Sequence, residues 1–181
     1  SSVDNLLDKY EMVLSQTKRL KKGLMKTLLT KGIDHKKFKK VNWLYGKKIE
    51  IPEKWNYEHL GNTTKLFSGY AFKSNDYSGN EIYLLKISNV SHGKLVWEDK
   101  SFLPNNFWDI YDDFHIIKGD IVMAMTRPII STGIKITMIM ESKKMLLNQR
   151  VGKFISTLNI DFLNHILNSN HFFVQIKRSL L

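Results

Sequence analysis

Residues 3–30 read VDNLLDKYEMVLSQTKRLKKGLMKTLLT, and this stretch decides how the rest of the chain is organised. Steps of four and three residues alternate along one stripe: Leu6, Tyr10, Val13, Thr17, Leu20 and Leu24. A second stripe lies beside it: Val3, Leu7, Leu14 and Leu28. Such spacing is typical of a helix that packs in a coiled coil, although the combined face is wider than a strict seam. We therefore expect a rod roughly 42 Å long, at about 1.5 Å per residue.

The charges of this stretch follow the order that a helix dipole favours. Asp4 stands in the first turn, Lys26 stands in the last turn, and Gly32 follows as a stop signal. We assign residues 1–32 to an amphipathic spacer helix. The alternative is a surface helix packed on its own domain, but a chain of 181 residues offers little to cover a helix of this length. Five positions are expected to contact a partner: Leu6, Tyr10, Val13, Leu20 and Leu24.

Composition restricts the possible compartment and partners. The chain has no cysteine, which argues against a disulfide framework and suits a reducing compartment. No apolar run reaches the roughly 18 residues of a membrane span, and the N-terminus lacks a signal-peptide pattern. We therefore expect a cytoplasmic protein without a membrane partner. The net charge is +11, and residues 18–48 hold 12 Lys or Arg against one acid. Such a localised positive field attracts polyanions, although a solvated basic linker would look the same.

Beyond the helix the periodicity changes twice. Residues 33–50 read as a basic connector, and Pro52 with Trp55 marks the expected start of a domain that covers residues 51–181. Short β-branched and aromatic runs separated by turn signals predict a mostly antiparallel, β-rich region to about residue 155. The runs are 63–67, 82–90, 94–97, 120–125, 134–140 and 151–155. Helical spacing returns from Asp161, with Asn159 or Asp161 as cap and a break at Asn168-Ser169-Asn170. The fold class is α+β.

The order of several short motifs carries a family resemblance. After the helix come Ile51-Pro52 with Trp55, Leu60-Gly61, Ser68-Gly69-Tyr70-Ala71-Phe72, Ile87-Ser88-Asn89-Val90, Lys118-Gly119-Asp120-Ile121-Val122 and Asn148-Gln149-Arg150-Val151. This order resembles the specificity subunit of a type I restriction-modification system, over nearly the whole chain. The chain departs from the family by holding one spacer helix and one target-recognition domain where members usually have two of each.

The resemblance implies a function and a set of partners. It implies a non-catalytic subunit that reads one half of a split site in double-stranded DNA. It also implies methyltransferase (modification) subunits and, through them, a restriction subunit. The partner of the spacer helix is then a second spacer helix of the same subunit or an identical chain. Gln149 and Arg150, which precede a strand, are expected either to support this recognition or to tie down structure.

The residue types of three loops suit the edges of DNA bases. Arg or Lys binds guanine, Asn or Gln binds adenine, and Ser or Thr binds either. Arg127 is the first choice, because the proline after it favours an extended, presented side chain. Gly69 and Gly133 can allow close backbone approach, and each loop taken alone is equally a solvated turn. The candidate DNA-binding residues are Lys36, Lys37, Lys39, Lys40, Tyr70, Lys73, Ser74, Lys86, Asn89 and Arg127.

Two further function classes remain open. Asp120, followed about twenty residues later by Glu141 and Lys143, matches the spacing of a metal-dependent nuclease site. Asp120 is equally a turn residue, and such a degenerate match arises readily by chance. A coiled-coil adaptor with an incidental basic segment is the third class. The sequence has no phosphate-binding glycine loop and no clustered histidines, so we expect no cofactor, no metal and no catalytic residue.

Overall fold

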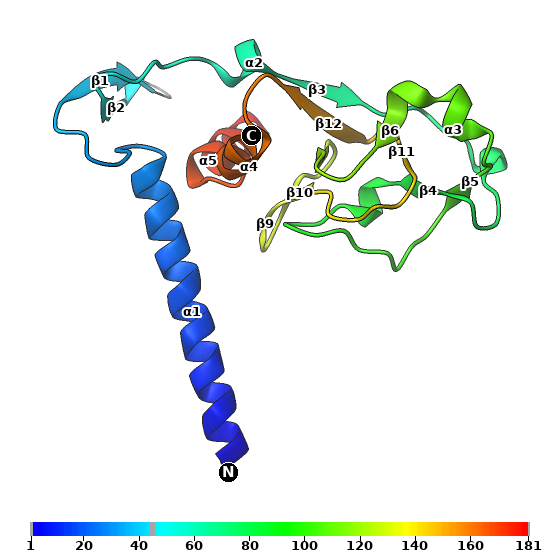
Figure 1. Cartoon of the computed structure of the whole chain (residues 1–181), viewed down its shortest axis with the longest axis horizontal. Coiled ribbons are helices and arrows are strands. Elements are labelled where there is room, and N and C mark those ends of the chain that lie inside the picture. The colour runs from blue at the N-terminus through cyan, green and yellow to red at the C-terminus, as the bar shows by residue number, and fades with distance from the viewer. Residues whose placement is uncertain (1, 44–45, 181) are drawn as a thin grey trace. The chain divides into compact units, whose positions relative to one another are not determined.

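The computed structural model describes residues 2–43 and 46–180 of the chain (Figure 1). The chain divides into two compact units. The first comprises Ser1–Tyr57 with Ser169–His171, and the second comprises Glu58–Asn168 with Phe172–Leu181. Within the described residues no helix is long and apolar enough to cross a membrane.

The first unit begins with the expected long helix. Helix α1 runs from Ser2 to Leu28, and none of its residues is buried. It ends in hydrogen-bonded turns in which the N–H of Gly32 donates to the carbonyl of Thr27 at 3.2 Å, with Gly32 at a φ of 65°. A β-carbon cannot be added to Gly32 without meeting the rings of His35 and Trp55 at 2.7 to 2.9 Å. The predicted helix and its stop at Gly32 are therefore confirmed.

The connector after α1 contains an antiparallel hairpin that the sequence analysis did not predict. Strand β1 (Phe38–Asn42) pairs with β2 (Lys48–Pro52) over five residue pairs. Ile51 and Pro52, which we expected to open the recognition domain, lie in β2. Trp55 packs edge-on against His35 with ring centroids 5.7 Å apart, so it anchors the connector to the end of α1.

The second unit contains two four-stranded sheets. The first sheet has the order β10-β7-β12-β3 and is antiparallel throughout. Its strands are β3 (Thr64–Ser68), β7 (Ile121–Ala124), β10 (Ile136–Met138) and β12 (Val151–Ser156). The second sheet has the order β5-β4-β11-β6, and its β4 and β11 are parallel. Its strands are β4 (Ile82–Leu85), β5 (Phe102–Leu103), β6 (His115–Ile116) and β11 (Met145–Leu147).

Short elements complete the second unit. A two-stranded hairpin, β8 (Ile129–Ile130) with β9 (Gly133–Ile134), projects between β7 and β10. The helices are α2 (Leu60–Thr63), α3 (Phe107–Ile110), α4 (Ile160–Leu167) and α5 (Asn170–Ser179). Three single-turn 3₁₀ helices are η2 (Ser74–Asp76), η3 (Ile87–Asn89) and η4 (Asp112–Phe114). The side chain of Asn159 caps α4 by accepting from the N–H groups of Asp161 and Phe162 at 3.0 Å, as the sequence predicted.

The cores follow from the two-residue alternation of the strands. In β7, Val122 faces a cluster shared with the second sheet, whereas Ile121 and Met123 face helix α4. In β4 of the second sheet, Leu85 lies in the same shared cluster, whereas Leu84 packs with the aromatic residues of α3. Strands β7 and β4 are thus covered on both faces, which fixes the register of these strands.

The predicted strands are only partly confirmed. The runs 63–67, 120–125 and 151–155 form β3, β7 and β12, while run 134–140 is divided between β9 and β10. The run 82–90 leaves the sheet after Leu85, and residues 94–97 make only an isolated bridge through Leu95 to Val90. The sequence analysis missed β11, a three-residue buried run without alternation. The α+β class with C-terminal helices is confirmed.

Candidate nucleic-acid interface

One end of the first sheet gathers three of the connecting loops. Strand β3 ends there at Ser68, which pairs with Gly152 near the start of β12. Val151 of β12 pairs in turn with Ala124 at the end of β7. Strand β10 begins at this same end, with Ile136 opposite Met123. The antiparallel order therefore brings residues 68–70, 125–135 and 148–150 together, and we call them the sheet-end surface.

Backbone hydrogen bonds join these three loops to one another. The N–H of Tyr70 donates to the carbonyl of Leu147, and the N–H of Gln149 donates to the carbonyl of Tyr70, both at 2.9 Å. The N–H of Met125 donates to the carbonyl of Arg150 at 3.0 Å. The hydroxyl of Ser68 donates to the carbonyl of Gln149, also at 3.0 Å. The loops are thus held by the sheet rather than left as independent turns.

Gly69 is required for this close approach. A β-carbon at Gly69 would lie 2.2 Å from the carbonyl oxygen of Leu147 and 2.5 Å from the carbonyl carbon of Asn148. Both are backbone atoms that cannot rotate away. A β-carbon at Gly133 would meet the ring of His92 at 2.8 Å, and His92 Nδ1 lies 3.0 Å from the carbonyl oxygen of Ile134. Both glycines therefore allow close contacts within the protein, and the expected approach of their backbone to DNA stays a prediction.

Arg127 is exposed at the start of the projecting hairpin, but its backbone is not extended. Its φ is 48°, a left-handed value that few residues other than glycine adopt. Pro128 after it is buried, and its carbonyl accepts a hydrogen bond from the N–H of Lys135 at 2.7 Å. The hairpin closure therefore determines the backbone at Arg127, against the extended preference of a residue before proline. The side chain is nevertheless solvent-facing, as are those of Thr126, Ser131 and Thr132.

Tyr70, at the edge of the sheet-end surface, belongs to an aromatic cluster. Its ring lies 4.9 Å from Phe72, 4.7 Å from Tyr111 and 5.5 Å from Phe114, yet its side chain remains 40% exposed. A hydrogen bond with the Tyr70 hydroxyl raises the pKa of Tyr111 above its ordinary value of 10.0. The neighbouring rings therefore pack against Tyr70, while part of its side chain remains open to solvent.

Lys73 and Ser74 are exposed, as a DNA contact requires. They lie at the start of η2, where the Lys73 N–H donates to the Asp76 carboxylate at 2.7 Å. Lys36, Lys37, Lys39 and Lys40 are likewise exposed, on the connector and on β1 of the first unit.

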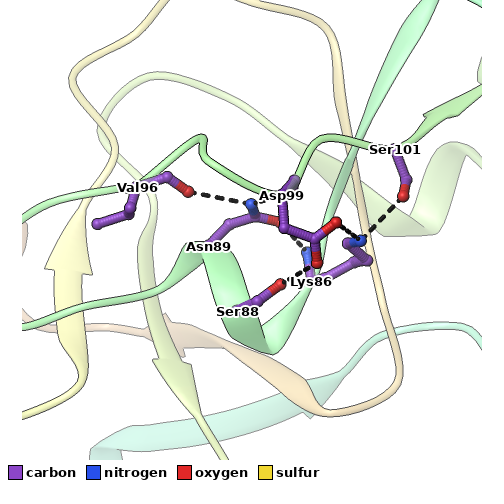
Figure 2. Close-up of polar contacts among 6 residues, drawn as sticks. All are labelled: Lys86, Ser88, Asn89, Val96, Asp99 and Ser101. Atoms are coloured by element: carbon purple, nitrogen blue, oxygen red, sulfur yellow. Dashed lines mark hydrogen bonds and ion pairs between the residues drawn. The ribbon is translucent and has the colours of Figure 1, made fainter.

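Asn89 does not face solvent, and this overturns its predicted role at base edges. It is fully buried, and its side-chain oxygen accepts from the Lys86 N–H at 2.9 Å. Its amide donates to the carbonyls of Val96 at 3.0 Å and Asp99 at 2.8 Å (Figure 2). All of its hydrogen-bonding groups are therefore used inside the domain.

Lys86 is committed to the same network. Its ammonium lies 2.7 Å from the Asp99 carboxylate and 2.9 Å from the Ser101 hydroxyl (Figure 2). Hydrogen bonds from Lys86 and then from Ser88 lower the pKa of Asp99. The network starts one residue after Leu85, whose carbonyl accepts from the N–H of Asn148. Lys86 and Asn89 thus stabilise the loop beside the sheet-end surface; the expected base contact of Asn89 is corrected to this positioning role, whereas that of Lys86 stays a prediction.

Gln149 and Arg150 are the residues whose role the sequence left undecided. Their backbones tie the loops together, but both side chains are exposed on the sheet-end surface. Two polar residues just before a strand do not show from the sequence alone which other loop they adjoin. Only the sheet order shows that this turn stands beside the one that carries Arg127.

The residues of the possible nuclease site are engaged separately. Asp120 accepts from the N–H of Ile117 at 2.9 Å and lies 3.7 Å from the ammonium of Lys153. Glu141 accepts from the indole of Trp97 at 3.0 Å and pairs with Lys143 at 2.9 Å. Burial alone would raise the pKa of Glu141, but the hydrogen bonds from Lys143 and Trp97 outweigh it and lower that pKa. Among the described residues no group of three or more acids or histidines could hold a metal ion.

Comparison with known proteins supports the resemblance that the motifs carry. The chain is 37% identical over 186 aligned positions to the Type I restriction enzyme MjaVIII specificity subunit of Methanocaldococcus jannaschii; the alignment covers 100% of this chain and 43% of that protein. It is 36% identical to the Type I restriction enzyme EcoAI specificity subunit of Escherichia coli, over 71% of this chain and 22% of that protein. No family model matches the chain.

A solved structure shares the fold. The HsdS subunit from Thermoanaerobacter tengcongensis superposes with a TM-score of 0.51 at 12% identity, over 91% of this chain and 37% of that chain. The chain thus spans less than half the length of each of these relatives. The predicted resemblance to type I specificity subunits is confirmed.

Proposed function

We propose that this chain, a relative of type I restriction enzyme specificity subunits, reads one half of a bipartite DNA site through its sheet-end surface. The observation that carries the proposal is that two adjoining turns at one end of the first sheet carry exposed guanidinium and amide side chains. Arg127 comes from the β7–β8 turn, and Gln149 and Arg150 come from the β11–β12 turn. A backbone hydrogen bond from the N–H of Met125 to the carbonyl of Arg150 joins the two turns, and the pairing of β7 with β12 holds them in place before any ligand binds.

The chemistry of these groups matches base edges in the major groove. A guanidinium forms two hydrogen bonds with guanine, and a glutamine amide does the same with adenine. Preformed loops lose little conformational freedom on binding, so more of each contact appears as affinity. Thr126, Ser131 and Thr132 add exposed hydroxyls on the hairpin, and Tyr70 adds an aromatic edge.

Phosphate contacts would supply most of the affinity that does not depend on sequence. The exposed lysines of the connector, Lys36, Lys37, Lys39 and Lys40, are suited to this, since residues 36–48 contain six lysines and no acid. Lys73 and Ser74 at η2 can add contacts from the recognition domain. The chain itself would bind DNA and perform no catalysis.

We also propose the assembly in which this chain would act. Ten large apolar side chains of α1 are between 43% and 67% exposed, and such a face is stable in water only when it is covered. Leu6, Tyr10, Val13, Leu20 and Leu24 would pack against a second spacer helix, from a longer subunit or from an identical chain. Methyltransferase subunits, and the restriction subunit through them, would complete the complex.

Selection of duplexes from a random pool tests this function. The full chain should enrich one short sequence in a salt-sensitive manner, and affinity should fall steeply as salt rises. Binding without any sequence preference would contradict the proposal. Cleavage that requires magnesium would instead indicate the nuclease alternative, which no observation in the described residues favours.

A matched pair of substitutions at Arg127 tests the site. Arg127→Ala should weaken binding to the selected duplex by about 1 to 3 kcal/mol, mainly through one base position. Arg127→Lys keeps the charge but lacks the planar fork, so it should restore affinity for all duplexes without restoring that preference. If Arg127→Lys restores both the affinity and the base preference, Arg127 is a phosphate contact.

A further inference from the structure

The hairpin of β1 and β2 has two chemically different faces. In an antiparallel pair, directly opposed residues point to the same side of the sheet. Val41 and Ile49 are opposed, and they are half-buried on the same side as the buried Ile51. The other side bears the opposed pairs Lys40 with Glu50 and Asn42 with Lys48, all of them exposed, and beyond them the exposed Phe38 opposite the buried Pro52. The side of Val41 and Ile49 is therefore the inner face, although it also bears the exposed Lys39, and the two polar pairs on the outer face are open to solvent.

The residues around this outer face are strongly basic. Residues 36–48 hold six lysines and no acid, and Glu50 is the one acidic residue on the two strands. Among the described residues, no ion pair engages Lys40, Lys47 or Lys48. A positive field without internal partners favours a polyanionic ligand over a neutral or basic one.

The outer face also carries the residue types that distinguish bases. Asn42 suits adenine, Lys48 suits guanine, and the carboxylate of Glu50 can accept from the amino group of cytosine. A two-stranded antiparallel ribbon is one of the two elements that the major groove of B-form DNA admits. The carboxylate lies in the middle pair of the ribbon and the amide lies in the pair next to the turn, so this face offers groups beyond those that neutralise phosphates.

We propose that the outer face of the β1–β2 ribbon enters the major groove of double-stranded DNA and reads bases there through Asn42 and Lys48. This is a second contact region, additional to the sheet-end surface, and it rests on the proposed function that the chain binds DNA. Lys36, Lys37 and Lys47, which flank the strands, contact the phosphates on either side of the groove. The half-site is then longer than the sheet-end surface alone would read.

A pair of variants with equal charge separates the two faces. Lys48→Ala removes a positive charge from the outer face, and Lys39→Ala removes one from the opposite side, where Lys39 is opposed to Ile51. Asn42→Ala combined with Lys48→Ala should lower affinity for the selected duplex roughly 10- to 100-fold, while nonspecific affinity falls no more than it does for Lys39→Ala. All of these side chains are exposed, so thermal unfolding should be unchanged in each variant.

Selection with the full chain decides between the outcomes. The Asn42 and Lys48 double variant should lose the preference at one or two adjacent base positions and keep the remainder of the site, including the position that Arg127→Ala relaxes. If the double variant selects the same site with the same affinity, the ribbon proposal is overturned, and an acidic protein partner becomes the expected ligand of this face. If the double variant loses the same affinity for all sequences, the proposal is overturned in favour of phosphate contact. If Arg127→Ala still relaxes the site in these cases, the proposed function stands. A chain that selects no sequence overturns both.

Discussion

Replacement of Arg127 by glycine separates a binding role from a folding role at one residue. The left-handed φ of 48° costs a non-glycine residue about 1 to 2 kcal/mol. Glycine removes this strain but adds about 0.4 to 1 kcal/mol of unfolded-state entropy. The net change in the free energy of unfolding of Arg127→Gly should therefore lie between about zero and 1.6 kcal/mol in the stabilising direction.

The same substitution should reduce DNA binding. Loss of a two-pronged guanine contact costs about 1 to 3 kcal/mol, or roughly 5- to 150-fold in affinity. Urea denaturation measures the first quantity and titration of the selected duplex measures the second. Arg127→Ala is the control, because it should lose the same affinity without the gain in stability. Destabilisation by Arg127→Gly beyond about 1 kcal/mol, or undiminished binding, would refute the reasoning, since the arginine would then serve the fold.

Four further substitutions or insertions test the structure around the site. Asn89→Ala should destabilise the fold by about 2 to 4 kcal/mol in urea, because it leaves buried hydrogen-bonding groups without partners. Gly69→Ala should cost about 1 to 3 kcal/mol of stability, whereas Gly79→Ala, where no atom lies within 4 Å of the added carbon, should be near neutral. The pKa of Glu141 is lowered in the folded state from its ordinary value of 4.5. The ionised carboxylate therefore stabilises the fold above about pH 4.5, and this stabilisation should be lost as the pH falls through the lowered pKa. Glu141→Gln should not show this loss. Four residues inserted after Leu14 lengthen α1 by roughly 6 Å, so a form with paired helices should prefer half-sites one or two base pairs farther apart; an unchanged spacing would contradict a ruler role.

Local signals were sufficient where one element carries its own pattern. The long stripe of α1, the stop at Gly32 and the cap at Asn159 depend on neighbouring residues, and each is found in the structure. The β1–β2 hairpin was not predicted, because Lys39 lies on the same side as Val41 and Ile49 and interrupts the apolar alternation of the strand.

The candidate site depended on long-range pairing, which the sequence does not display. The turns that carry Gln149 and Arg127 adjoin only because β12 pairs with β7. Asn89 and Lys86 carry the residue types of base readers, but a network that closes with Asp99 uses them for stability. Residue type therefore identified the chemistry, while burial and partners decided which groups remain available to a ligand.

The central claim is that side chains of the sheet-end surface read individual bases. Its most direct test is the affinity of the wild-type chain and of Gln149→Ala for the selected duplex and for every single-base change in it. The wild-type chain should lose about 1 to 3 kcal/mol at each position that it reads. Gln149→Ala should become indifferent at one position, expected to be an adenine, and respond normally at the others. Identical profiles for the two proteins would contradict the claim for Gln149, and a flat profile for the wild-type chain would contradict it altogether.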